Sequence, residues 1–116
     1  MRIAVVGSRG FGPIIEVSRR LDFIRSKTAD MEIVSGGADG VDKKAEEWAN
    51  ASGIKTAIFP ANWEEFGDAA GPKRNATIVE NSDCMIAFWD GESPGTLDAI
   101  CRGQKRKDYP VVVYLG

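Results

Sequence analysis

The 116-residue sequence predicts an α/β fold in which a parallel sheet of five strands lies between two layers of helices. Short runs rich in β-branched residues alternate along the chain with longer segments whose apolar residues recur at helical spacing. The second, fourth and fifth short runs are almost continuously apolar, which is typical of strands that helices cover on both faces. The length fits a single domain, residues 1–116, because no repeat, linker or low-complexity tract divides the chain.

The first half of the chain supplies three strands and two helices. The expected strands are 3–6, 32–35 and 55–59, and the expected helices begin near Pro13 and near Asp39. Proline is favoured in the first turn of a helix, and Gly53 is typical of a helix end. Val41, Ala45 and Trp48 share one face of the second helix, so we expect Trp48 to lie in the core.

The second half continues the alternation. The expected segments are a loop over 60–71, a helix from Pro72 to near Asn81, a strand over 84–89, a loop over 90–94, a helix over 96–107 and a strand over 111–115. Right-handed crossovers through these helices give a parallel sheet in three layers, which is a Rossmann-like architecture. In such sheets ligands bind beyond the carboxyl ends of the strands, where the unusual residues of this chain fall.

The composition excludes several classes of function. Without histidine there is no imidazole base or Ser-His-Asp triad, and two cysteines alone cannot hold zinc, so we expect no metal site. The net charge of −2 argues against broad binding of nucleic acid. Cys84 and Cys101 lie in apolar stretches, which favours buried free thiols in a reducing compartment. No membrane span or signal peptide is evident, so we expect a cytoplasmic protein.

A glycine-rich turn follows the first strand. Its residues are Gly7, Ser8, Arg9, Gly10, Phe11 and Gly12. The glycines allow a ligand to approach the backbone, and Arg9 could pair with a phosphate in bidentate fashion. A flexible turn with a solvated arginine explains the same residues.

A second glycine-rich turn leads into a helix. Its residues are Ser35, Gly36, Gly37, Ala38, Asp39, Gly40, Val41 and Asp42. Free N–H groups at a helix N-terminus favour phosphate or ribose binding. The turn is neither a Walker A loop nor a complete dinucleotide fingerprint, since Ser35 replaces the first glycine and no acidic residue ends the third strand. We therefore do not expect NAD or another cofactor. Alternatively, Asp39 caps the helix with Asp42 as its partner, which leaves the paired glycines unexplained.

Two further clusters precede the last two helices. Lys73 and Arg74 fall in a predicted first turn, where the helix dipole disfavours each cation by roughly 0.3–1 kcal/mol. A bound anion would relieve this conflict, although both side chains could simply extend into water; we select Arg74 and the neighbouring Asn75 as site residues. In the segment 89–96, Gly95 and Thr96 could meet a phosphate at a helix N-terminus, or Ser93 or Thr96 could act as a cap.

Two groups of residues have an ordinary explanation beside a functional one. Trp63 and Phe66 lie in the long loop, where a base could stack on one of them or the loop could pack on its own side chains. The basic run of Arg102, Lys105, Arg106 and Lys107 resembles a nucleic-acid patch. It also ends a helix, where cations complement the dipole, and we adopt this second interpretation.

Together these segments resemble the SLOG superfamily, which takes in DNA-processing protein A and the lonely-guy enzymes, and most closely its YspA/YpsA-related branch. The resemblance covers nearly the whole chain. It rests on Gly7-Ser8-Arg9, residues 35–42, Pro60-Ala61-Asn62-Trp63, residues 70–75, Phe88-Trp89-Asp90 and Gly95-Thr96. It implies a Rossmann-like fold with strand order 3-2-1-4-5 that binds nucleotides or nucleotide-derived ligands.

The chain departs from the enzymes of this superfamily at one position. Lonely-guy enzymes cleave a ribose–base bond with the glutamate of a Pro-Gly-Gly-x-Gly-Thr-x-x-Glu motif. Here Ala99 stands at that position, and Asp98, one residue earlier, is turned by about 100° around the helix. The DNA-processing branch binds DNA through basic surface and extra domains, which this acidic chain lacks.

We therefore expect a binding module that senses or sequesters a nucleotide-type ligand such as an ADP-ribose derivative. Glycine-rich loops and Thr96 would hold phosphate, Arg9 and Arg74 would neutralise it, and Asp42 or Asn75 would orient ribose or the loops. The candidate ligand-binding residues are Gly7, Ser8, Arg9, Ser35, Gly36, Gly37, Ala38, Gly40, Asp42, Arg74, Asn75, Trp89, Gly95 and Thr96.

Two alternatives remain open. One is a nucleotide hydrolase of the N-glycosidase type, whose proton donor or acceptor would have to be a carboxylate. Its candidates are Asp42, Asp90, Glu92 and Asp98. The other is a DNA-binding protein, which predicts a steep dependence of affinity on salt. Partly exposed covering helices would also be compatible with a homo-oligomer.

Overall fold

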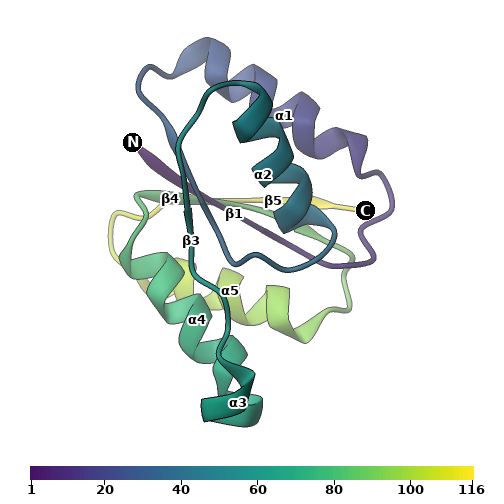
Figure 1. Ribbon diagram of the computed structural model, residues 1–116, viewed down its shortest axis with the longest axis vertical. Coiled ribbons are helices and arrows are strands. Elements are labelled where there is room, and N and C mark those ends of the chain that lie inside the picture. Colours follow the sequence, from purple (N-terminus) through teal and green to yellow (C-terminus); the bar gives the residue numbers. More distant parts are fainter.

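Five parallel strands form one sheet in the order β3-β2-β1-β4-β5 in the computed structural model, which describes all residues 1–116 (Figure 1). The strands are β1 (Arg2–Gly7), β2 (Glu32–Ser35), β3 (Thr56–Ile58), β4 (Cys84–Trp89) and β5 (Val111–Leu115). Every neighbouring pair of strands is parallel. The predicted α/β class and the strand order implied by the resemblance are both confirmed.

Helices cover both faces of the sheet. They are α1 (Ile15–Lys27), α2 (Val41–Ala51), α3 (Trp63–Phe66), α4 (Ala70–Glu80) and α5 (Pro94–Lys105), with a 3₁₀ helix, η1, at Gly67–Ala69. Figure 1 shows α1 and α2 on one side of the sheet and α4 and α5 on the other, with α3 at the far end of the molecule. Each pair of helices encloses its own apolar cluster against the sheet.

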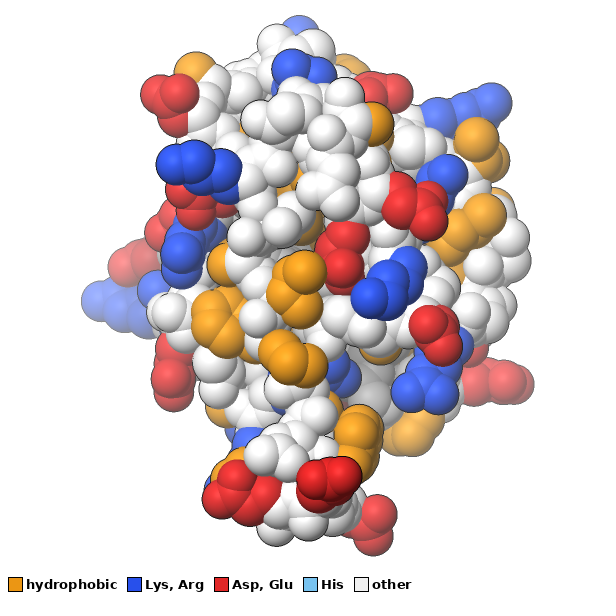
Figure 2. Space-filling model, viewed as in Figure 1, with side chains coloured by type: hydrophobic (Ala, Val, Ile, Leu, Met, Phe, Trp, Pro, Cys, Tyr) orange, Lys and Arg blue, Asp and Glu red, His pale blue; other side chains and the backbone are white.

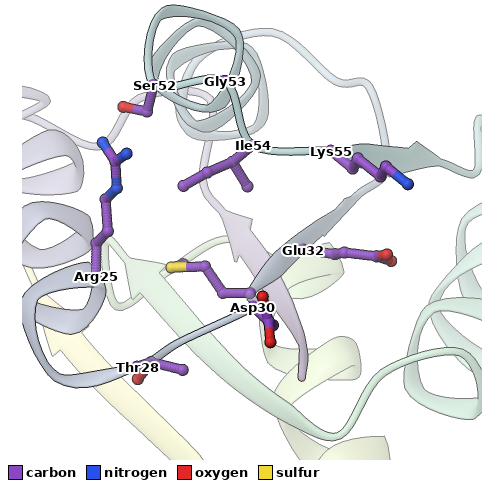
Figure 3. A pocket seen from close by; sticks show the side chains of 9 residues that line it. Arg25, Thr28, Asp30, Glu32, Ser52, Gly53, Ile54 and Lys55 are labelled. Atoms are coloured by element: carbon purple, nitrogen blue, oxygen red, sulfur yellow. The ribbon is translucent and has the colours of Figure 1, made fainter.

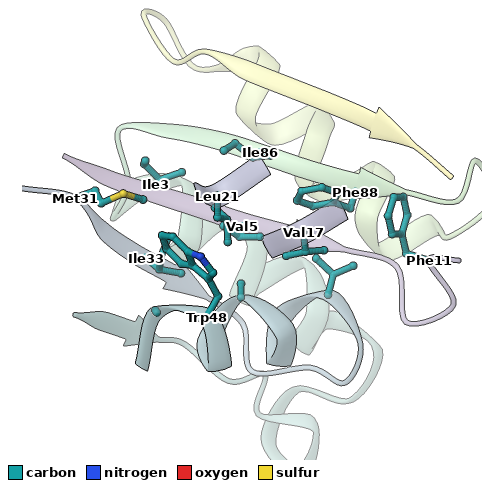
Figure 4. Packing of buried hydrophobic residues seen from close by; sticks show 13 residues of the cluster. Ile3, Val5, Phe11, Val17, Leu21, Met31, Ile33, Trp48, Ile86 and Phe88 are labelled. Atoms are coloured by element: carbon teal, nitrogen blue, oxygen red, sulfur yellow. The ribbon is translucent and has the colours of Figure 1, made fainter. Parts of the chain in front are cut away.

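The larger cluster lies between α1, α2 and the sheet (Figure 4). Leu21 of α1 packs there with Val5 of β1 and Ile33 of β2, and none of the three is exposed to solvent. Trp48 is 8% exposed, and its indole N–H donates to the Asp22 carboxylate at 2.8 Å, which joins α2 to α1. The prediction that Trp48 lies in the core is confirmed.

Several element boundaries differ from the prediction. The expected loop over 60–71 contains α3 and η1, and α4 begins at Ala70 rather than at Pro72. Asp39 does not cap α2, because the helix begins after Gly40, whose φ of +83° is far from helical. The last helix begins two residues earlier than expected, at Pro94, and ends at Lys105. These shifts change which side chains occupy the first helical turns.

Two predictions about burial are wrong. The apolar run of β5 predicts cover on both faces, yet β5 is an edge strand and leaves Val112, Val113 and Leu115 exposed. Cys101 is exposed and Cys84 half-buried, so the two free cysteines are not both core residues. No helix of the protein combines the length and the apolar character needed to cross a membrane.

Candidate functional site

A cleft of about 660 Å³ opens beyond the carboxyl ends of the strands. Residues from all four sequence clusters line it: Gly7, Arg9, Ala38, Asp42, Arg74, Asn75, Gly95 and Thr96. The other predicted site residues, Ser8, Ser35, Gly36, Gly37, Gly40 and Trp89, lie outside this lining. A smaller hollow of about 380 Å³ at the amino ends of β2 and β3, between Arg25 and Lys55, contains none of the predicted residues (Figure 3).

The glycines around the cleft fall into two groups. At Gly7 a β-carbon would lie 2.5 Å from the Val41 side chain, and at Gly40 it would lie 2.8 Å from the Arg9 carbonyl oxygen. Close packing inside the protein therefore accounts for these two glycines. A β-carbon at Gly10 or Gly95 would meet nothing within 4 Å, although both residues line the cleft. No contact within the protein explains the missing side chain at these two positions.

The N-terminus of α5 is open. The Asp90 carboxylate accepts the backbone N–H groups of Ser93 at 2.8 Å and Glu92 at 2.9 Å, and these bonds hold the pKa of Asp90 below its usual value. No side chain caps α5, and no loop carbonyl accepts the N–H groups of Gly95 and Thr96. Such free donors at a helix N-terminus form an anion-binding position. The expected cap by Ser93 or Thr96 is absent.

Two of the predicted site residues, Ser8 and Trp89, form hydrogen bonds with the loop between β4 and α5. Ser8 is 1% exposed, and its hydroxyl accepts the Asp90 N–H at 3.1 Å and lies 3.3 Å from the Thr96 hydroxyl. The Trp89 indole N–H donates to the Ser93 carbonyl at 3.0 Å. Both side chains thus fix the chain between β4 and α5.

Asn75 connects α4 to α5. Its amide nitrogen donates to the Gly95 carbonyl at 3.1 Å and to the Asp98 carboxylate at 3.0 Å. Its carbonyl oxygen accepts the Arg74 Nε–H at 3.1 Å. Asn75 is 5% exposed, so these bonds replace water that it cannot reach.

The two predicted arginines differ in what they bind. Arg74 donates from Nη1 to the Gly36 carbonyl at 2.9 Å, and a β-carbon at Gly36 would collide with this guanidinium. Arg9 makes no hydrogen bond and no ion pair, and it is exposed at the rim of the cleft. Since α4 begins at Ala70, Arg74 lies beyond the first turn, and the expected conflict with the helix dipole does not apply to it.

Two buried carboxylates occupy one face of α2. Asp42 accepts the Ala38 N–H at 3.2 Å and is 5% exposed, and Glu46 accepts the Ser35 hydroxyl at 2.8 Å and is 8% exposed. Burial raises the pKa of Asp42 from 3.8 to about 6, against the opposing effects of the Ala38 N–H and of Arg74. The sequence interpretation missed Glu46, although its spacing of four residues from Asp42 places both on the same helical face.

Two of the four residues in the basic run near the end of α5 contact other groups of the protein. Arg102 pairs with Asp98 at 2.9 Å, and Arg106 donates to the carbonyls of Val79 and Ser82. The interpretation of this run as part of the helix end, rather than as a nucleic-acid patch, agrees with these contacts.

The fold and the cleft define a small Rossmann-like domain with an open cleft at the carboxyl edge of its sheet. The model of the YspA, cpYpsA-related SLOG family matches residues 1–66. The Gene 61 protein of Mycobacterium phage D29 is 31% identical in an alignment of 111 positions that covers 90% of this chain and 89% of the phage protein. The chain therefore belongs to the YspA, cpYpsA-related SLOG family. No solved structure matches it significantly.

Proposed function

We propose that the protein binds a nucleotide or a nucleotide-derived ligand, such as an ADP-ribose derivative, and acts as a sensor or sequestering module. Family membership supports a nucleotide-related function. The open N-terminus of α5 is the observation that carries the proposal. The backbone N–H groups of Gly95 and Thr96 have no partner, and no contact within the protein requires glycine at position 95.

The roles of the residues follow from their contacts. The backbone of Gly95 and Thr96 holds the phosphate, and Arg9 supplies the positive charge because nothing else occupies its guanidinium. Arg74 and Asn75 hold the elements around the cleft in place, because Arg74 bonds to the Gly36 carbonyl and Asn75 bonds to α5. Asp42 orients the ribose. Gly36 packs against the Arg74 guanidinium, and Gly37 has a φ of +73°, so both glycines shape the turn that follows β2.

Isothermal titration calorimetry against a panel of nucleoside monophosphates and ADP-ribose tests the proposal. A Gly95→Val variant places a side chain in the open space and is expected to lower affinity at least tenfold, about 1.4 kcal/mol, without loss of fold. Gly12→Val is the matched control, because Gly12 is equally open but lies outside the cleft. If wild type binds no member of the panel, or Gly95→Val binds as wild type does, the proposal fails.

One observation favours a nucleotide hydrolase as the second candidate. Of the four carboxylates considered, Asp90 is held by two backbone N–H groups and Asp98 by Asn75 and Arg102. Glu92 lies outside the cleft lining, so Asp42 alone combines a place in the cleft with a pKa of about 6. Chromatography of products after incubation with nucleoside monophosphates would detect turnover. Base release by wild type that Asp42→Asn abolishes would establish hydrolysis.

A further inference from the structure

Trp63 keeps its ring surface and its N–H group available in the cleft. Its side chain is 54% exposed and lines the cleft together with Gly95 and Thr96. The indole N–H groups of Trp48 and Trp89 donate to Asp22 and to the Ser93 carbonyl, whereas that of Trp63 makes no hydrogen bond. Of the three tryptophans, only Trp63 is left with an unused donor.

The Trp63 side chain is held at the start of its helix and at the edge of its ring. The Asn62 side chain accepts the Glu65 N–H at 3.1 Å and donates to the Glu65 carboxylate at 3.1 Å, which closes the start of α3. A β-carbon at Gly71 would come within 3.3 Å of Cη2 of Trp63, so the edge of the ring rests against the start of α4. A ring held by its edge loses little freedom when a ligand packs on its face.

Exposure of an aromatic ring is not in itself a sign of a site, and Phe66 on the same short helix provides the comparison. Phe66 is 40% exposed, but the Lys73 ammonium lies 4.8 Å from its ring centre, and Phe66 does not line the cleft. Trp63 has no such partner. Phe66 thus contacts a cation of the protein itself, whereas the ring of Trp63 is exposed in the cleft without such a contact.

We infer that Trp63 is a stacking platform for a nucleobase. The inference rests on the proposed function, because it assigns the second part of a ligand whose phosphate lies at the N-terminus of α5. It names the substrate class as a nucleotide with an intact base, rather than a sugar phosphate or inorganic phosphate. Every base has a π face, so stacking gives affinity without base selectivity, and the free indole N–H adds one donor toward the ligand.

Calorimetry with two kinds of probe tests the inference. The probes are the four common nucleoside monophosphates and ribose 5-phosphate, which has the same sugar and phosphate but no base. Wild type should bind the best nucleotide at least tenfold more tightly than ribose 5-phosphate. Trp63→Ala should weaken nucleotide binding about ten- to a hundredfold and leave ribose 5-phosphate binding unchanged, while Trp63→Phe should retain most of the affinity. Phe66→Ala is the matched control and should bind as wild type does.

The outcomes separate the two proposals. Equal affinity of wild type for nucleotide and ribose 5-phosphate, or full nucleotide affinity in Trp63→Ala, overturns stacking and leaves the phosphate site in place. Equal loss of both probes in a Trp63→Ala protein with a native circular dichroism spectrum also overturns it, since Trp63 would then only support the loop. If wild type binds neither probe, the proposed function itself fails.

Discussion

Individual residues of similar type have different roles in this cleft. Arg9 and Arg74 each follow a glycine-containing segment, and the sequence assigned both to phosphate. Arg74 instead donates to the Gly36 carbonyl and to Asn75, whereas Arg9 has no partner. The difference arises because Arg74 lies on α4 opposite the Gly36 turn, and this proximity depends on the tertiary fold rather than on either local sequence.

This division predicts opposite effects of two substitutions. Arg9→Gln should lower nucleotide affinity about tenfold and leave the free energy of unfolding unchanged, because its guanidinium binds nothing in the protein. Arg74→Gln should lower the free energy of unfolding by about 1–3 kcal/mol, since the Gly36 carbonyl loses a charged donor. Calorimetry and urea denaturation measure the two quantities. If both variants lost the same affinity and had the same free energy of unfolding, the two arginines would not have these different roles.

Asp42 predicts a dependence of stability on pH. Folding raises its pKa from 3.8 to about 6, so between these values the folded state binds the proton more tightly than the unfolded state. The free energy of unfolding should therefore fall as pH rises through this window, by roughly 2–3 kcal/mol from this group. The charged groups that face Asp42 are Arg74 on α4 and Glu46 on α2.

The Asp42→Asn variant checks this sign. It should be more stable than wild type near pH 7.5, by up to roughly 2–3 kcal/mol, and the difference should disappear only below about pH 3, where Asp42 is protonated in both the folded and the unfolded state. Urea denaturation at a series of pH values gives the curve. A constant difference across the series would show that burial of this carboxylate has no net cost.

At the scale of elements, the site depends on how α4 and α5 are joined. Asn75 makes three hydrogen bonds, and its partners at Gly95 and Asp98 both belong to the first part of α5. Since Gly95, Thr96 and Arg9 line the same cleft, this connection helps to set the position of the proposed phosphate site.

Removal of that connection should therefore affect stability and binding together. Asn75→Ala removes the three hydrogen bonds of a side chain that is itself buried, and we expect a loss of about 2–3 kcal/mol in the free energy of unfolding. Thr77→Ala, on the same helix, removes only one hydroxyl bond to Lys73 and should cost less than about 1 kcal/mol. Similar losses in both variants would mean that Asn75 does not join the helices.

The elements also show what sequence patterns can predict. Short apolar runs located the strands, and apolar residues at helical spacing located α1 and α2. The four-residue α3 has no such spacing and no buried residue, so the sequence predicts a loop there. The sequence nevertheless contains a capping signal, since Asn62 is followed three residues later by Glu65. In the structure the Asn62 side chain forms hydrogen bonds with both the backbone N–H and the carboxylate of Glu65.

At the scale of the whole molecule, the order of strands brings the four clusters together. Gly7, Asp42, Asn75 and Thr96 are far apart in sequence, and each follows or faces the carboxyl end of a strand. The rule for parallel sheets thus predicted their meeting. It could not predict which side chains line the cleft, since Ser8 and Trp89 were also selected as site residues but lie outside the lining. Nor could composition distinguish the edge strand β5 from a buried strand, because both are apolar.

The distribution of charge gives the last prediction, which concerns DNA. Figure 2 shows positive and negative side chains interspersed over this face, without a region of positive charge alone. The net charge is −2, and Arg102 and Arg106 of the basic run already bind groups of the protein. Nonspecific DNA binding requires several free cations along one surface, since released counterions supply its free energy.

We therefore expect no saturable binding of duplex DNA by fluorescence polarisation at about 50 mM salt, at protein concentrations up to roughly 100 μM, the weak end of nonspecific affinity. The same preparation should bind a nucleoside monophosphate by calorimetry, which shows that the protein is active in the assay. A polarisation signal that saturates and then falls steeply as salt rises to about 200 mM would contradict the prediction. Such a result would place free cations, Arg9 included, on a surface that tracks the phosphate backbone rather than in a cleft for one nucleotide.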